Sequence, residues 1–134
     1  MRLYVTLGLA ALLLMLSVTV LAHHSAINFW YTDRKVEIEG VVKSVKIVNP
    51  HPEMVIVVTE SNGQKSEWRI SGGGHATGMI RAGWKDETLP VGMKVKVKGS
   101  PSRQEGAKAL LAGDVTRPDG TVVSFSSGSG PIDQ

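Results

Sequence analysis

The chain has 134 residues, a formal net charge of +3 at pH 7 and no cysteine. This length suits one ordinary domain that can hold a hydrophobic core without covalent staples. The missing cysteines exclude disulfides and thiolate chemistry, and the small excess of positive charge argues against a nucleic-acid partner.

The first 22 residues form the only long apolar run of the chain, and Arg2 is their only charge. A charged start, an apolar middle and small residues at the end are typical of a cleaved secretory signal peptide. A membrane anchor is the alternative, because the run approaches the ~18–20 residues that span a bilayer. Polar sequence directly after Val20-Leu21-Ala22 favours cleavage after Ala22. We therefore expect a periplasmic or secreted protein that begins at His23 and has no stable membrane insertion.

A short arm, residues 23–34, precedes a series of strand-like segments and carries Phe29, Trp30 and Tyr31. Gly40 lies inside the first segment and predicts a bulge or a sharp bend. A helix is expected over residues 75–84, with Gly83 at its end. The tail, residues 126–134, is expected to be disordered. Apolar patterning and turn residues predict strands over residues 35–49, 54–60, 66–71, 93–99, 108–117 and 121–125.

The order of these elements predicts the fold class. Three strands, a short helix, two strands and a small extra strand favour an all-β fold over residues 35–125. We expect a small oligonucleotide/oligosaccharide-binding (OB)-like Greek-key barrel of five to six strands, with one short helix between strands three and four. A β-sandwich is the rival, but seven evenly spaced strands are not visible. Lys94, Lys96 and Lys98 alternate with apolar residues, which indicates the solvent face of one strand rather than a nucleic-acid patch.

Several short motifs follow one another along the chain in a characteristic order. They are His23-His24-Ser25, Asn49-Pro50-His51, Trp68, Arg81-Ala82-Gly83-Trp84, Val91-Gly92 and Asp119-Gly120. This order resembles a family of small exported bacterial proteins of unknown function. The resemblance covers nearly the whole chain after the apolar run and implies an OB-type barrel and export, but no activity. The chain departs from the pattern in two places. Pro52-Glu53 follows Asn49-Pro50-His51, where family members usually continue straight into an apolar strand. Trp30-Tyr31-Thr32 precede Asp33, whereas the family tends to have an acidic residue directly after the arm's aromatic.

The predicted cleavage would leave a free amine beside the His23 ring. The α-amine and Nδ1 of an N-terminal histidine can chelate one metal ion, and a further imidazole would complete a nitrogen set that suits Cu(II). This arrangement resembles the histidine brace of copper-dependent polysaccharide oxidases and some periplasmic copper carriers. The candidate metal ligands are His23, His24, His51 and His75, with His51 preferred as the third donor. His24 offers an alternative chelate that needs no folded barrel.

Each candidate also has a structural interpretation. His51 alone is typical of a turn residue whose ring bonds to backbone, and His75 of a helix-start residue. Trp30 and Tyr31 are candidate ligand-binding residues that stack on a sugar or another planar group, or they cover an edge of the barrel. Met54, Met79 and Met93, like Trp68 and Trp84, are expected in the core.

Three functions compete. We rank first an exported, non-enzymatic binding module for a small ligand or a periplasmic protein. The most specific version of this hypothesis is a module that binds Cu(II) through His23. A protein- or sugar-binding OB barrel without metal is the alternative. A copper-dependent oxidative enzyme ranks last, because the chain is short and differently patterned from such oxidases.

Overall fold

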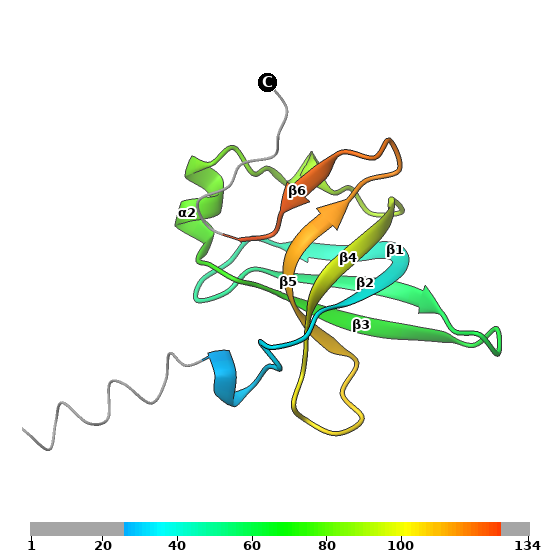
Figure 1. The fold of residues 1–134 in the computed structure, drawn as a ribbon. Coiled ribbons are helices and arrows are strands. Elements are labelled where there is room, and N and C mark those ends of the chain that lie inside the picture. The colour runs from blue at the N-terminus through cyan, green and yellow to red at the C-terminus, as the bar shows by residue number, and fades with distance from the viewer. Residues whose placement is uncertain (1–25, 127–134) are drawn as a thin grey trace, which may run out of the picture.

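The computed structural model describes residues 26–126, apart from the side chain of Asp86. The predicted signal peptide, both N-terminal histidines and the tail from residue 127 lie outside the described residues. Figure 1 shows the elements, which are η2 (Ala26–Asn28), β1 (Val36–Lys46), β2 (Glu53–Thr59), β3 (Lys65–Gly72), α2 (Ala76–Arg81), η3 (Asp86–Thr88), β4 (Lys94–Pro101), β5 (Ala109–Thr116) and β6 (Val122–Ser124).

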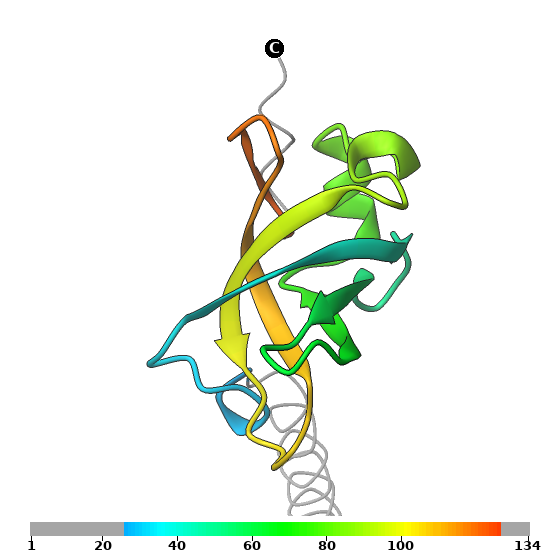
Figure 2. The ribbon, with the colours of Figure 1, turned by 90° about the vertical axis from the view of Figure 1, so that its right-hand side faces the viewer.

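The strands close into a barrel. The sheet order is β3-β2-β1-β4-β5-β6, and a further parallel pairing of β3 with β5 joins Arg69–Gly72 to Ala109–Ala112. β1 serves two neighbours, because its first half pairs with β4 and its second half with β2. Figure 2 shows β4 curving from the end that carries α2 down to the β4–β5 loop beside the arm. The predicted all-β, OB-like barrel with one short helix between β3 and β4 is confirmed.

At Gly40, the backbone of β1 lies close to the backbone of β2. A Cβ at Gly40 would lie 2.8 Å from the carbonyl oxygen of Val57, so only glycine fits without a shift of backbone. The bulge itself lies further along, between Val42 and Ser44. The expected irregularity of β1 is therefore split between a close backbone approach at Gly40 and a register shift two residues later.

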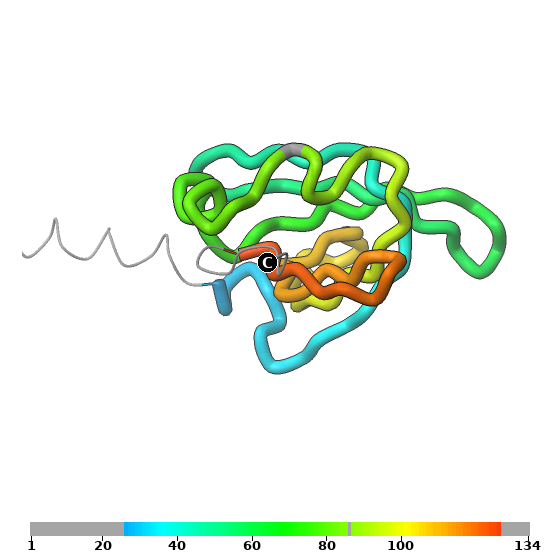
Figure 3. Tube along the Cα trace, turned by 90° about the horizontal axis from the view of Figure 1, so that it is seen from above, coloured from blue at the N-terminus to red at the C-terminus, as the bar shows by residue number. Residues whose placement is uncertain are grey.

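The core fills the barrel and continues under α2, which lies at one end of it (Figure 3). Met54 and Met79 are fully buried, and Met93 packs against the same cluster, as predicted. The Trp84 ring meets the Phe125 ring edge-on, with centroids 5.4 Å apart. Burial of each such side chain contributes roughly 1.5–3 kcal/mol, so the core stabilises the barrel without disulfides. The fully buried large side chains are Phe125, Met54, Ile56, Ile70, Met79, Leu89, Leu110, Val42, Val95, Val97, Val115 and Val123.

Gly83 ends α2 as the sequence predicts. Its φ is +93°, and its N–H donates to the Ile80 carbonyl while the Trp84 N–H donates to the Met79 carbonyl, both at 3.0 Å. These two bonds form a Schellman motif, which turns the chain so that Trp84 enters the core.

The lysine side chains of β4 form an exposed strand face. Lys94, Lys96 and Lys98 point to solvent between buried neighbours, and Lys94 Nζ lies 2.7 Å from Glu39 Oε1. This confirms the prediction of a solvated strand face. Between residues 26 and 126, no helix is long and apolar enough to cross a membrane.

Candidate functional site

A groove of about 880 Å³ lies between the arm and the barrel, and we call it the arm groove. Four segments that are distant in sequence meet there: the arm, the β1–β2 loop, the end of β3 and the β4–β5 loop with the start of β5. Its lining residues are Ala26, Asn28, Phe29, Trp30, His51, Ser71, Gly72, Gly73, Ser102, Arg103, Gln104, Ala107, Ala109 and Leu111.

The floor of the arm groove is the outer side of the parallel β3–β5 pairing. Ser71 pairs with Leu111 there, and Ala109 pairs with Arg69. Next to Ser71, Gly72 approaches its neighbours closely, because a Cβ at that position would lie 3.1 Å from Pro52 Cβ and 3.2 Å from the Phe125 carbonyl oxygen. The small side chains of Ser71 and Ala109 thus line the floor of the groove.

The arm is attached to the β4–β5 loop by backbone bonds. Trp30 forms an isolated β-bridge with Ser102, and the Tyr31 N–H donates to the Pro101 carbonyl at 2.9 Å. The Arg103 side chain adds two further bonds, from Nε to the carbonyl oxygen of Ile27 at 2.7 Å and to that of Trp30 at 3.2 Å. Figure 1 shows the arm beside this loop. The arm therefore packs on the barrel rather than extending from it.

The Tyr31 ring contacts two cations. The guanidinium carbon of Arg34 lies 3.8 Å from the ring centroid and that of Arg103 lies 4.4 Å from it. These two cation–π contacts are worth ~0.5–1 kcal/mol each at exposed sites. Tyr31 helps to fix the arm and does not line the groove.

The β1–β2 loop is tied to the segment that leads into α2. The Asn49 side-chain oxygen accepts a hydrogen bond from the Ala76 N–H at 3.2 Å, and the Pro52 carbonyl accepts one from the Gly72 N–H at 2.7 Å. Between them, His51 Nδ1 lies 3.3 Å from the Gly74 carbonyl oxygen. His51 is thus a loop residue bonded to backbone, as its structural interpretation predicts, and its ring borders the groove.

The structure brings some of the candidate residues together and separates others. His51 and Trp30 both line the arm groove, whereas Tyr31 lies outside the lining. His75 is the exposed N-cap residue of α2, its side chain makes no capping bond, and it does not line the groove. His23 and His24 lie outside the described residues, but Ala26, which follows them closely, lines the groove. Residues 26–126 contain no group of three or more His, Cys, Asp or Glu side chains that could hold a metal ion.

Phe29 and Arg103 belong to the groove although the sequence does not single them out as ligand-binding residues. Phe29 is 62% exposed at its rim. Phe29 is visible in the sequence as one of three arm aromatics, but nothing local shows which of the three faces the groove. Arg103 lies in a polar loop, and its contacts are with residues more than 70 positions away.

Carboxylates with a lowered pKa lie away from the arm groove. A hydrogen bond from Lys94 lowers the pKa of Glu39, one from Lys108 lowers that of Glu60, and one from the Thr121 hydroxyl lowers that of Asp119. Each of these three carboxylates accepts a hydrogen bond from a neighbouring side chain outside the groove. Their lowered pKa values therefore indicate structural roles.

Comparison with known proteins agrees with the resemblance to a family of unknown function. No curated protein and no solved structure matches this chain. The model of a family of unknown function (DUF6152) matches residues 11–111, which run from within the apolar N-terminal segment to the middle of β5. Because this match covers well over half of the sequence, the chain belongs to that family of unknown function.

Proposed function

We propose that the mature protein is an exported, non-enzymatic binding module that holds a small ligand in the arm groove. The groove itself carries this proposal, because its volume of about 880 Å³ falls in the range of ~300–1,000 Å³ that small-molecule sites occupy. Its apolar floor, the aromatic rim residues Phe29 and Trp30, and two polar side chains, His51 and Arg103, match the usual composition of such sites.

Export is proposed from the N-terminal sequence. Cleavage after Ala22 would leave His23, His24 and Ser25 ahead of Ala26, so the new N-terminus would start within a few residues of the groove. A natively expressed chain should therefore be found in the periplasm or the medium with the N-terminal sequence HHSAINF. Retention of Met1 in the membrane fraction would contradict this part of the proposal.

The ligand site can be tested by amide NMR on the exported protein. We expect the small-molecule fraction of a periplasmic extract to shift the amides of Gly73 and Arg103 and to raise the melting temperature. Ala109→Trp, which places a large side chain on the groove floor, should abolish both effects. Val122→Trp is the matched control, because Val122 is an outward strand residue of β6 that does not line the groove.

Shifts confined to other surfaces, such as the exposed lysine face of β4, would contradict the proposed ligand site. So would equal responses of the two tryptophan variants.

A sugar ligand is the second candidate. Phe29 is 62% exposed and Trp30 lies next to it at the groove, so a flat apolar surface is available for stacking. Addition of purified oligosaccharides should then shift the indole signal of Trp30. The signals of Trp84, which is buried, and of Trp68, which is partly buried against the core, should stay in place.

A further inference from the structure

The lining of the arm groove carries positive charge without a carboxylate to balance it. Arg103 is always charged, and His51 is the only other lining residue that can ionise. Among residues 26–126, no aspartate or glutamate lines the groove. Asp33 and Glu105 lie in the neighbouring segments, but both are exposed and neither forms an ion pair within that range. The electrostatics of the groove therefore favour an anionic ligand over a cationic one.

The Arg103 guanidinium is held in place by one of its donors and keeps the others for a ligand. Its Nε–H is shared between the carbonyl oxygens of Ile27 and Trp30, at 2.7 and 3.2 Å. The N–H groups of Nη1 and Nη2 form no hydrogen bond to any residue of the described chain. A guanidinium binds a planar carboxylate through two parallel bonds of this kind. Because the Nε bonds already fix its position, little side-chain freedom is lost when such an anion binds.

A second guanidinium adds to the positive potential at this end of the groove. Arg34 and Arg103 contact the same Tyr31 ring, with guanidinium carbons 3.8 and 4.4 Å from its centroid. Two cations on one ring lie within about one Debye length (~8–10 Å) of each other, so their fields add with little screening. Neither arginine pairs with a carboxylate between residues 26 and 126. A ligand anion would therefore meet positive charge that the described chain does not neutralise.

His51 limits where the anion can lie. Its Nδ1 lies 3.3 Å from the Gly74 carbonyl oxygen, which can only accept a hydrogen bond, so Nδ1 carries the proton. In the neutral ring, Nε2 then has a lone pair and cannot donate to a carboxylate. The donors for an anion are thus those of Arg103, at the side of the groove where the arm is attached.

The rest of the lining suits an apolar, planar body. Phe29 is 62% exposed and Trp30 lies next to it, while Ala109 and Leu111 add apolar surface. Aromatic rings stack on or meet the edges of such side chains. We propose that the arm groove binds a small aromatic carboxylate, whose carboxylate pairs with the Nη groups of Arg103 and whose ring packs against the arm aromatics. This inference rests on the ligand site proposed above and gives that ligand a chemical class.

Three probes that share one ring system test the charge of the ligand. They are 2-naphthoate, the uncharged 2-naphthamide and the cationic 2-naphthylmethylammonium, added to protein purified from cells that express the full chain. We expect 2-naphthoate to bind at least about tenfold more tightly than 2-naphthamide, because a charge-assisted pair with a guanidinium is stronger than a neutral hydrogen bond. The cation should not bind measurably. Calorimetric titration measures the affinities, and added salt should weaken the binding of the anion alone.

Arg103→Gln keeps hydrogen-bond donors at this position but removes the charge. It should abolish the preference for 2-naphthoate over 2-naphthamide. Arg81→Gln is the matched control, because Arg81 lies at the exposed end of α2 outside the groove lining, and it should keep the wild-type preference. His51→Gln should also keep it, since the carboxylate is bound by Arg103.

A measurement on wild-type protein covers the case in which Arg103→Gln releases the arm and both probes lose their site. In NMR spectra, 2-naphthoate should shift the side-chain Nε–H signal of Arg103 together with the amide of Gly73. The side-chain signal of Arg81 should stay in place.

Equal affinities of wild-type protein for 2-naphthoate and 2-naphthamide would overturn the carboxylate. So would an Arg103 side-chain signal that 2-naphthoate leaves unchanged, or no binding of 2-naphthoate at millimolar concentration. The ligand site has its own test in the periplasmic fraction. If that fraction shifts the amides of Gly73 and Arg103 while 2-naphthoate fails, the groove stands and the ligand class is wrong. If neither shifts them, both proposals fail.

Discussion

Arg103 shows how one residue holds the arm at the side of the groove. Its Nε bonds to two arm carbonyls, its own N–H donates to the Phe29 carbonyl at 2.9 Å, and its guanidinium covers one face of Tyr31. Only a planar guanidinium offers directed donors and a stacking face together, so lysine is no substitute here. The wall of the groove therefore depends on a residue that is exposed and lies in a polar loop.

Arg103→Lys should release the arm while the barrel stays folded. We expect a loss of about 1 kcal/mol in the free energy of unfolding, since the bonds are exposed to solvent. Amide exchange at Tyr31, whose N–H bonds to Pro101, should become much faster. Urea titration and hydrogen exchange measure these two effects. Arg81→Lys, at the exposed end of α2, is the control and should leave both unchanged. An unaltered exchange rate at Tyr31 in Arg103→Lys would show that backbone bonds alone hold the arm.

At the scale of elements, the β1–β2 loop and the start of α2 act as one unit. The N-cap position of α2 is His75, whose side chain makes no capping bond, and the first helical N–H bonds instead to Asn49. The short helix is thus capped by a loop that lies 27 residues earlier in the chain. This contact also sets where His51 stands, because Asn49 and His51 belong to the same loop.

Asn49→Ala should cost about 1 kcal/mol of stability, as loss of a helix cap typically does. The first turn of α2 should exchange its amides faster, and the His51 ring signals should move, because the loop loses its tie to the helix. Chemical denaturation and NMR would measure both. His75→Ala removes the side chain at the nominal cap and should be nearly neutral in comparison. A larger loss for His75→Ala than for Asn49→Ala would contradict this assignment of the cap.

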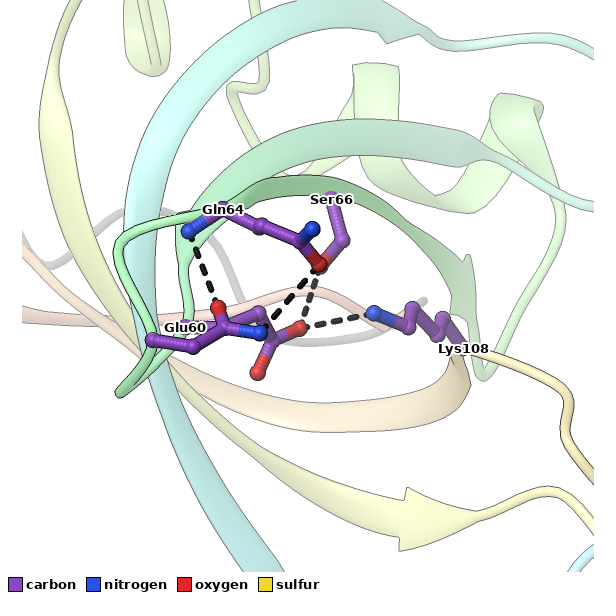
Figure 4. A network of polar contacts seen from close by, with 5 residues as sticks. Glu60, Gln64, Ser66 and Lys108 are labelled. Carbon is purple, nitrogen blue, oxygen red and sulfur yellow. Dashed lines mark hydrogen bonds and ion pairs between the residues drawn. The ribbon is translucent and has the colours of Figure 1, made fainter.

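At the scale of the whole molecule, closure of the barrel depends on the short parallel pairing of β3 with β5. Next to this pairing, Glu60 at the end of the β2–β3 hairpin bonds to Lys108 at 2.8 Å and to Ser66, as Figure 4 shows. The hairpin projects from the rest of the barrel (Figure 3), and this ion pair links its turn to the chain just before β5. The hydrogen bond from Lys108, followed by that from Ser66, lowers the pKa of Glu60 below its ordinary value of 4.5.

The lowered pKa of Glu60 has a defined sign in the stability of the protein. The ionised carboxylate is favoured in the folded state, so its contribution is present above the unfolded pKa and is lost as the pH falls through the lower folded value. Glu60→Gln should therefore lower the melting temperature near pH 7, and the difference from wild type should vanish once the pH falls below the lowered pKa of the folded state. Because the pair is partly exposed, high salt should reduce the difference.

Thermal unfolding at several pH values measures this effect. Glu105→Gln, in the β4–β5 loop, is the control, since Glu105 makes no ion pair within residues 26–126. A Glu60→Gln difference that stays the same from pH 7 to strongly acidic pH would show that charge plays no part in it.

The sequence by itself determined the barrel and most of its boundaries. Alternation of apolar residues defines β4, Asn62-Gly63 joins β2 to β3, and Gly83 ends α2, because period, turn conformation and helix capping are local properties of the chain. It also singled out His51 and Trp30, two residues that line the groove. Export and copper binding stay predictions, since they concern residues 1–25.

Only the tertiary structure decided which of these residues form a site. It places His51 and Trp30 in the groove, leaves His75 at the exposed start of α2 and turns Tyr31 towards two arginines. It also adds Arg103 and gives the capping of α2 to Asn49. The physical reason is that the bonds of Asn49 to α2 and of Arg103 to the arm join residues 27 and 76 positions apart, whose separation is set by barrel closure. No local pattern in the sequence encodes the distance between two loops that a closed sheet brings together.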